Sequence, residues 1–287
     1  MHDHIVKGVA AGSVRIFAAV TTQLVEEGRR RHDCYPVAAA ALGRTMTGAL
    51  LLAADLKTQE RITIRIAGDG PIGEVIADAD GAGTVRGYVK QPQIDLPLRE
   101  GKLDVAAAVG NGNIHVTRFT GMKQPFTGNA SLVSGEIAED ITHYLYSSEQ
   151  TLSSVALGVL VNPDATVAAA GGFFIQVMPG AEEGVITQVE KNLAALAPIS
   201  SLVKTGLAAS DIIQHAFAGL EYTIQEEQPL AFRCTCSRDK VSNMLISLGR
   251  EELEDMANEE EAEIICHFCA EAYAFKREEL QCLIDEL

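Results

Sequence analysis

Two pairs of closely spaced cysteines constrain the fold of this chain more than any other feature. Residues 234–236 read Cys-Thr-Cys and residues 266–269 read Cys-His-Phe-Cys, with 29 residues between the two pairs. Four thiolates arranged in this way can close a tetrahedron around one Zn²⁺ ion at Zn–S distances of about 2.3 Å. The sequence therefore predicts one zinc ion per chain. The predicted ligands are Cys234, Cys236, Cys266 and Cys269.

A four-thiolate site of this kind has two interpretations. It can be a closed structural centre that only stabilises a small fold. It can also be a redox switch, because oxidants attack cysteine thiolates and the same ligands can become disulfides. The tight spacing of the CxC pair favours the second interpretation.

Three further residues are candidates for a metal-binding or redox role: His267, Cys34 and Cys282. His267 could act as a ligand only if one of the neighbouring thiols were released. Cys34 follows Arg29-Arg30-Arg31-His32, whose charges could lower its pKa, but a lone cysteine is typical of a small buried apolar position. Cys282 has no partner at ligand spacing. We expect neither cysteine to bind the metal.

The net charge and the first residues argue against a nucleic-acid partner and against secretion. The formal net charge is −16, and residues 234–287 alone hold 14 acidic and 5 basic side chains. Nucleic-acid affinity depends on Lys and Arg, so a nucleic-acid partner is not expected. The first residues lack the basic start and apolar stretch of a secretory signal. We expect a cytoplasmic protein whose six cysteines are reduced.

The segment 37–56 is the one stretch that suggests a membrane span. Arg44 lies within it and would cost about 2.5–3.5 kcal/mol at the centre of a bilayer. We therefore predict a buried helix and no membrane partner.

Length and patterning predict an α+β protein in three parts. A chain of 287 residues with 47% hydrophobic content is long enough for two folded units. We predict a mixed-sheet domain with covering helices over 1–179, a helical linker over 180–232 and a small zinc domain over 233–287. Alternating apolar residues predict strands, and a three-to-four residue spacing predicts helices. The predicted strands are 14–20, 61–66, 73–79, 85–89, 113–119, 126–133, 154–161 and 173–178; the predicted helices include 36–56, 136–146, 182–196, 200–206, 208–219, 239–248, 251–258 and 276–287, and 263–275 is predicted to be a hairpin.

Enzyme function is the alternative interpretation, with the four cysteines as an appended structural zinc ribbon. Its active site would lie near residues 148–150 or Gly171-Gly172, although no nucleophile, base and orienting group converge there in the sequence. Gly68 to Gly73 matches GxGxxG, but an alternating strand pattern follows it, which favours a tight turn over a dinucleotide site. No phosphate-binding GxxxxGK[ST] motif is present. His2 and His4 are expected on a frayed terminus.

Together these residues resemble the heat shock protein 33 family of bacterial redox-regulated holding chaperones. The resemblance runs almost end to end, and the four-cysteine pattern is its most specific part. Further matching stretches are 29–32, 68–73, 85–89, 134–140, 148–150 and 171–176.

The resemblance implies a function and a mechanism that composition and spacing do not reach. It implies an ATP-independent holdase that binds unfolding client proteins under oxidative stress and is not an enzyme. It implies that Cys234 pairs with Cys236 and Cys266 with Cys269 on oxidation, and that zinc is then released. It also implies a metastable linker over 180–232 and a homodimer in the oxidised state.

Overall fold

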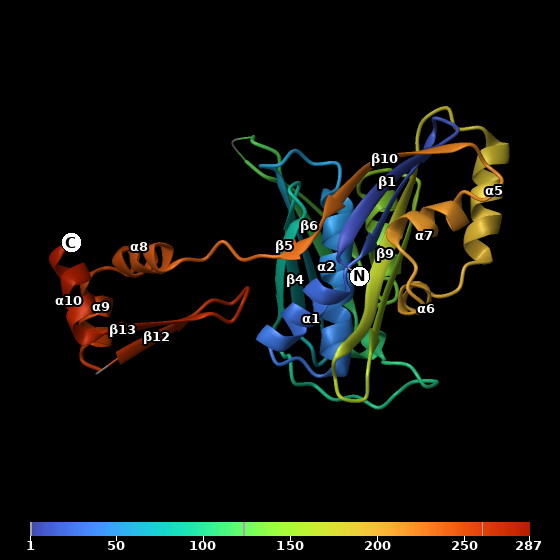
Figure 1. Ribbon diagram of the computed structural model, residues 1–287. Helices are drawn as coiled ribbons and strands as arrows, with labels where there is room; N and C mark the ends of the chain where they lie inside the picture. Colours follow the sequence, from blue (N-terminus) through green and yellow to red (C-terminus); the bar gives the residue numbers. More distant parts are fainter. Residues whose placement is uncertain (1, 123, 260) are drawn as a thin grey trace. The chain divides into compact units, whose positions relative to one another are not determined.

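A computed structural model describes residues 2–122, 124–259 and 261–287 (Figure 1). The chain divides into two compact units, Met1–Arg233 and Cys234–Leu287. Both combine helices with antiparallel strands, which confirms the predicted α+β class.

A five-stranded sheet forms one half of Met1–Arg233. Its strand order is β10-β1-β2-β9-β8, and all neighbours are antiparallel. Small and apolar side chains dominate β2 and β9, which lie inside the sheet and are buried on both faces. The strands are β1 (His4–Ala10), β2 (Val14–Val20), β8 (Ser153–Val161), β9 (Val167–Val177) and β10 (Tyr222–Pro229).

A six-stranded sheet forms the other half, in the order β11-β5-β4-β3-β6-β7. The short strand β11 joins β5 in parallel, and the other neighbours are antiparallel. The strands are β3 (Arg61–Gly68), β4 (Glu74–Asp80), β5 (Thr84–Val89), β6 (Gly112–Phe119), β7 (Phe126–Ser131) and β11 (Ala231–Phe232).

Helix α2 (Pro36–Ala53) is the centre of this unit and contacts strands of both sheets (Figure 1). Its length and composition would allow it to cross a membrane, but 89% of it is buried inside the protein. This confirms the predicted buried helix, which begins with Pro36 as expected. Arg44 bonds the carboxylate and the backbone carbonyl of Glu136. Further helices complete the core: α1 (Thr22–Arg31), α3 (Val105–Val109) and α4 (Ala138–Ser147).

The GxGxxG stretch is a tight turn between β3 and β4, as predicted. The Gly68 N–H donates to the Gly73 carbonyl at 3.1 Å, which closes the turn. A Cβ atom on Gly70 would lie 2.4 Å from the Ala108 carbonyl oxygen, so the α3 backbone excludes any side chain there. These glycines therefore serve close backbone packing.

Residues 180–232 are helical only in part. Helices α5, α6 and α7 cover the outer face of the five-stranded sheet and share an apolar cluster with it (Figure 1). Their buried residues include Val189, Ile199, Val203, Ile212 and Ile213. The predicted helical character is wrong for the last part of the segment, which forms β10 and β11, because pairing with β1 and β5 overrides local preference. The helices are α5 (Glu183–Ala194), α6 (Ile199–Lys204) and α7 (Ala209–Ala216).

His4 also differs from expectation. It begins β1, pairs with Pro229 of β10, and its Nε2 accepts a hydrogen bond from the Ala209 N–H at 3.3 Å. The expectation of a frayed terminus is therefore wrong for His4, because strand pairing on both sides orders the chain from this residue onward.

The unit Cys234–Leu287 has a small core of its own. Helices α8 (Arg238–Leu248), α9 (Arg250–Ala257) and α10 (Arg277–Asp285) accompany the hairpin of β12 (Glu261–Ile265) and β13 (Ala272–Lys276). The hairpin and the three helices were all predicted from the sequence. The buried apolar residues are Val241, Leu245, Leu253, Ala262, Phe275, Leu280 and Ile284.

A buried carboxylate organises the turn before α4. Asp140 is 0% exposed. Its two oxygens accept hydrogen bonds from the backbone N–H groups of Val133, Ser134, Gly135 and Ile137 at 2.7, 3.0, 3.3 and 2.8 Å. One side chain thus satisfies four backbone N–H groups of the segment between β7 and α4.

We expect Asp140→Ala to destabilise Met1–Arg233 by more than about 3 kcal/mol, because several buried N–H groups lose their acceptor together. Chemical denaturation followed by circular dichroism measures the effect. The control is Asp95→Ala, at an exposed position. Equal stability of the two variants would contradict the role given to Asp140.

Candidate metal centre

The structure brings the four predicted ligands together. Cys234 and Cys236 precede α8, and Cys266 and Cys269 lie in the turn between β12 and β13. Their sulfur atoms all lie within 4.8 Å of one another, and no disulfide joins them. The Sγ–Sγ distance is 3.8 Å between Cys234 and Cys266 and 3.4 Å between Cys236 and Cys269.

These distances fit a tetrahedral metal ion. Zn–S bonds of about 2.3 Å imply sulfur atoms separated by about 3.8 Å along each edge of the tetrahedron. A disulfide bond would require an S–S distance of about 2.05 Å. The four cysteines could therefore hold a metal ion, and their soft sulfur donors suit zinc. Among the described residues, His267 is not part of this group of potential metal ligands.

Backbone geometry prepares the CxxC pair. The Ala270 N–H donates to the Cys266 carbonyl at 2.8 Å, and Ala270 has a φ of 54°, which turns the chain back into β13. The N–H groups of Phe268 and Glu271 donate to the sulfur atoms of Cys266 and Cys269. Each of these sulfur atoms thus has a donor that favours its thiolate form.

The CxC pair is held by the start of α8. The Ser237 hydroxyl caps the helix by accepting a bond from the Lys240 N–H at 3.3 Å. The Lys240 ammonium donates to the Thr235 carbonyl at 2.6 Å, between the two ligands. The Tyr273 hydroxyl donates to the Cys236 sulfur at 3.1 Å from the facing hairpin.

Burial makes these thiols costly to ionise unless a cation is present. It is the largest cause that raises the pKa of Cys266 and of Cys269, and the backbone N–H donors oppose it. A divalent cation reverses this balance, because a coordinating thiol is deprotonated outright. The site therefore combines four clustered sulfur donors with an environment that favours one shared cation.

The two remaining cysteines lie elsewhere. Cys34 is 2% exposed and belongs to the core around α2, which confirms the expected buried position. Burial raises its pKa to about 12 and outweighs the nearby charge of Arg29. Cys282 is exposed on α10.

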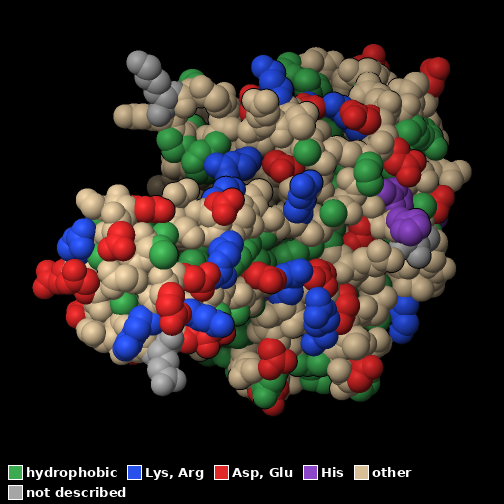
Figure 2. Space-filling view, turned by 60° about the vertical axis from the view of Figure 1, so that its left-hand side comes forward, with side chains coloured by type: hydrophobic (Ala, Val, Ile, Leu, Met, Phe, Trp, Pro, Cys, Tyr) green, Lys and Arg blue, Asp and Glu red, His purple; other side chains and the backbone are tan. Residues whose placement is uncertain are grey.

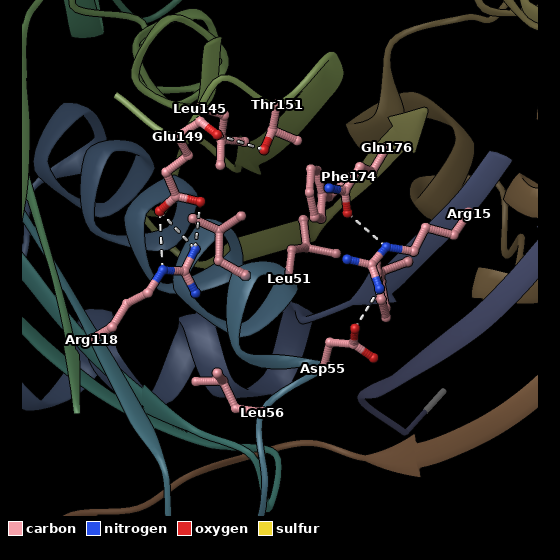
Figure 3. Close-up of a pocket in the computed structure, with 12 residues that line it drawn as sticks. Arg15, Leu51, Asp55, Leu56, Arg118, Leu145, Glu149, Thr151, Phe174 and Gln176 are labelled. Carbon is pink, nitrogen blue, oxygen red and sulfur yellow. Dashed lines mark hydrogen bonds and ion pairs between the residues drawn. The ribbon is translucent and has the colours of Figure 1, made fainter. Parts of the chain in front are cut away.

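A cavity of about 280 Å³ lies beside Glu149, where the enzyme alternative placed an active site (Figure 3). Both oxygens of Glu149 accept hydrogen bonds from Arg118, at 3.0 and 3.1 Å, and one also accepts from the Tyr144 hydroxyl at 2.9 Å. Across the cavity Arg15 is paired with Asp55 (Figure 3). The carboxylates are thus engaged in ion pairs that tie secondary-structure elements together. The apolar residues that line the cavity are Phe17, Leu51, Leu52, Leu56, Leu145 and Phe174.

Gly171 and Gly172, the other location considered for an enzyme, lie within β9. Cβ atoms there would approach the carbonyl oxygens of Ala19 and Ala156 to 2.6 and 2.7 Å. Close strand packing explains both glycines.

Acidic and basic side chains are interspersed on the face shown in Figure 2. Many basic groups are paired with carboxylates, including Arg29 with Glu26 and Arg65 with Glu74.

Known proteins resemble this chain along nearly its whole length. The model of the Hsp33 protein family matches residues 3–276. The chain belongs to the Hsp33 family. The 33 kDa chaperonin of Desulforamulus reducens is 51% identical over 290 residues, covering 100% of this chain and 99% of the relative. That of Bacillus subtilis is 48% identical over 288 residues, with 99% of each chain covered.

A solved structure confirms the fold of this Hsp33 family member. The crystal structure of the 33 kDa chaperonin from Thermotoga maritima superposes with a TM-score of 0.94 at 38% identity. The match covers 100% of this chain and 99% of that one. Membership of the family makes the protein a chaperone, for which client proteins are the partners.

We expect the two cysteines outside the centre to differ sharply in reactivity. An alkylating reagent near neutral pH should modify Cys282 in the folded protein and reach Cys34 only after denaturation. Burial raises the pKa of the Cys34 thiol from an ordinary value of 9.0 to about 12. The folding free energy that this buried, protonated thiol contributes is therefore present below pH 9.0 and is lost as the pH rises toward 12. Mass spectrometry of labelled peptides provides the measurement, and rapid labelling of native Cys34 would refute the assignment.

Proposed function

We propose that this protein is a redox-regulated, ATP-independent holding chaperone of the cytoplasm, with zinc bound by Cys234, Cys236, Cys266 and Cys269 in the reduced state. It would bind unfolding proteins and prevent their aggregation during oxidative stress. The observation that carries the proposal is the convergence of four sulfur atoms within 4.8 Å inside a unit that has a small core.

Energetics support zinc as the main stabiliser of Cys234–Leu287. Structural zinc contributes about 10–16 kcal/mol in small zinc peptides. A whole domain is held folded by about 5–15 kcal/mol. Domains below roughly 70 residues rarely reach stability from their core alone, and this unit is shorter than that. Loss of the metal is therefore expected to unfold it.

Oxidation by peroxide would convert the four thiolate ligands into two disulfides. Four thiolates and two hydrogen peroxide molecules give two disulfides and four hydroxide ions, with four electrons passing from sulfur to oxygen. We propose the pairs Cys234–Cys236 and Cys266–Cys269. Disulfides that close such short loops restrict the unfolded chain little, so oxidation would not restore the stability that the metal supplied.

Unfolding of 233–287 would then act on the segment 180–232, which we propose as the metastable linker. The end of this segment is joined directly to the proposed metal site in the sequence. The Arg233 N–H donates to the Val85 carbonyl at 2.8 Å, and the next residue is the proposed ligand Cys234. Release of α5 to α7 would expose the apolar residues that they share with the five-stranded sheet. Exposed apolar surface of this kind binds non-native proteins. In this proposal residues 1–179 remain folded and active molecules form homodimers.

Zinc content tests the ligand set. Reduced protein should hold one zinc ion per chain, because four thiolates converge on one centre. We expect Cys266→Ser to lose stoichiometric zinc, while the matched control Cys282→Ser keeps it. Metal analysis after dialysis provides the measurement, and a full zinc equivalent in Cys266→Ser would show that the ligands are wrongly assigned.

Peroxide treatment tests the switch. With mild heat it should release zinc, lower helicity, raise the fluorescence of a hydrophobic dye and suppress aggregation of a denaturing client, with no effect of added ATP. A client-aggregation assay on reduced and oxidised protein, with a zinc-sensitive dye in parallel, measures these changes. Zinc release without any gain in client holding would leave the centre with a purely structural role.

A further inference from the structure

Tyr273 is a side chain of β13 that reaches the metal centre without being a ligand. It lies opposite Ile264 in the β12–β13 hairpin, and its hydroxyl donates to the Cys236 sulfur at 3.1 Å. The hairpin carries Cys266 and Cys269, whereas Cys236 belongs to the segment before α8. The bond therefore connects the two halves of the ligand set.

The position of Tyr273 is fixed by its neighbours on β13. Arg238, in the first turn of α8, donates to the Ala274 carbonyl at 2.8 Å and lies over the Phe275 ring at 4.3 Å. Arg238 also bonds Glu279 at 2.7 Å. These contacts hold β13 against the start of the helix that follows Cys236, so the phenol is aimed at the sulfur in advance.

The sulfur atoms of the centre receive different kinds of donor. Cys266 and Cys269 accept hydrogen bonds from the backbone N–H groups of Phe268 and Glu271, which any substitution other than proline keeps. Cys236 accepts one from a phenol, whose donor a single substitution removes. A hydrogen bond to a thiolate stabilises its charge and so lowers its nucleophilicity, and the loss of a ligand's hydrogen-bond partner typically weakens metal binding. The bonded sulfur is then held more firmly as a ligand and is a weaker nucleophile.

We infer that Tyr273 is a positioning residue that retains Cys236 in the zinc site and slows its attack on peroxide. The inference rests on the proposed function, because it assumes that the four cysteines hold zinc. The step that it controls is the attack of the Cys236 thiolate on hydrogen peroxide. One sulfur–oxygen bond forms, the oxygen–oxygen bond breaks, and a sulfenic acid and hydroxide result. A second thiolate then displaces hydroxide from that sulfur to form the disulfide.

Tyr273→Phe keeps the ring and removes only the donor. Zinc affinity, measured by competition with a chromophoric chelator, should fall about tenfold, as is typical when a partner of a metal ligand is lost. Zinc release at a fixed peroxide dose should be several-fold faster, and trapping of sulfenic acid should increase at Cys236. The matched control is Tyr146→Phe, which removes an exposed hydroxyl from α4 and should behave as wild type.

Two further measurements separate a direct effect on sulfur from a change in folding. In cobalt-substituted protein, the sulfur-to-metal charge-transfer band should shift in Tyr273→Phe and not in Tyr146→Phe. Incorporation of 3-fluorotyrosine makes every phenol a stronger donor, so zinc release should slow in wild type and in Tyr146→Phe. It should not change in Tyr273→Phe. The fluorotyrosine result in wild type remains decisive if Tyr273→Phe does not fold.

The outcomes distinguish this inference from the function on which it rests. Wild-type protein that binds no stoichiometric zinc overturns the proposed function and the role of Tyr273 together. Wild type that holds zinc and releases it on oxidation, with identical rates and cobalt spectra in Tyr273→Phe, overturns the role of Tyr273 alone.

Discussion

The unit Cys234–Leu287 must be stabilised by something other than its apolar core. Its buried apolar cluster is small, and three helices and a hairpin depend on it. A fold of this size normally needs a metal, disulfides or a partner. The four sulfur atoms lie where the hairpin turn meets the segment before α8, so one ion could cross-link the parts that the core leaves weakly connected. Metal binding and folding would then be one equilibrium for this unit.

Met1–Arg233 obtains its stability in a different way. Helix α2 is buried between two sheets, and the residues around it form one continuous apolar cluster. Cys34, the one cysteine within that unit, is buried and keeps its proton far above neutral pH. Because oxidants attack thiolates, this unit presents no comparable target. An oxidant that attacked the four clustered cysteines could therefore leave the larger fold intact, as the proposed holding function requires.

The sequence predicted those features that depend on local spacing. The cysteine pairs, the buried helix from Pro36 and most strands follow from patterns within a few residues of one another. The pairing of β10 with β1 was missed, because Tyr222–Pro229 is acidic and exposed and becomes a strand only beside a partner more than two hundred residues away. Tyr273 was missed for the same reason. Its bond to Cys236 depends on the register of a hairpin that no spacing rule describes.

Charge gives the metal centre a further physical role. Residues 234–287 hold 14 acidic and 5 basic side chains, a net charge of −9. Self-repulsion of this kind destabilises a compact state and favours an expanded one. Four thiolates around a divalent cation leave the centre itself negative, so the metal would not relieve this repulsion; it would hold the compact state against the repulsion by cross-linking the chain. In the proposed switch, oxidation of the thiolates would remove the cross-link, while the acidic residues would remain. The unit would then have a small core and strong self-repulsion, and both would favour the unfolded chain over refolding around the short disulfides.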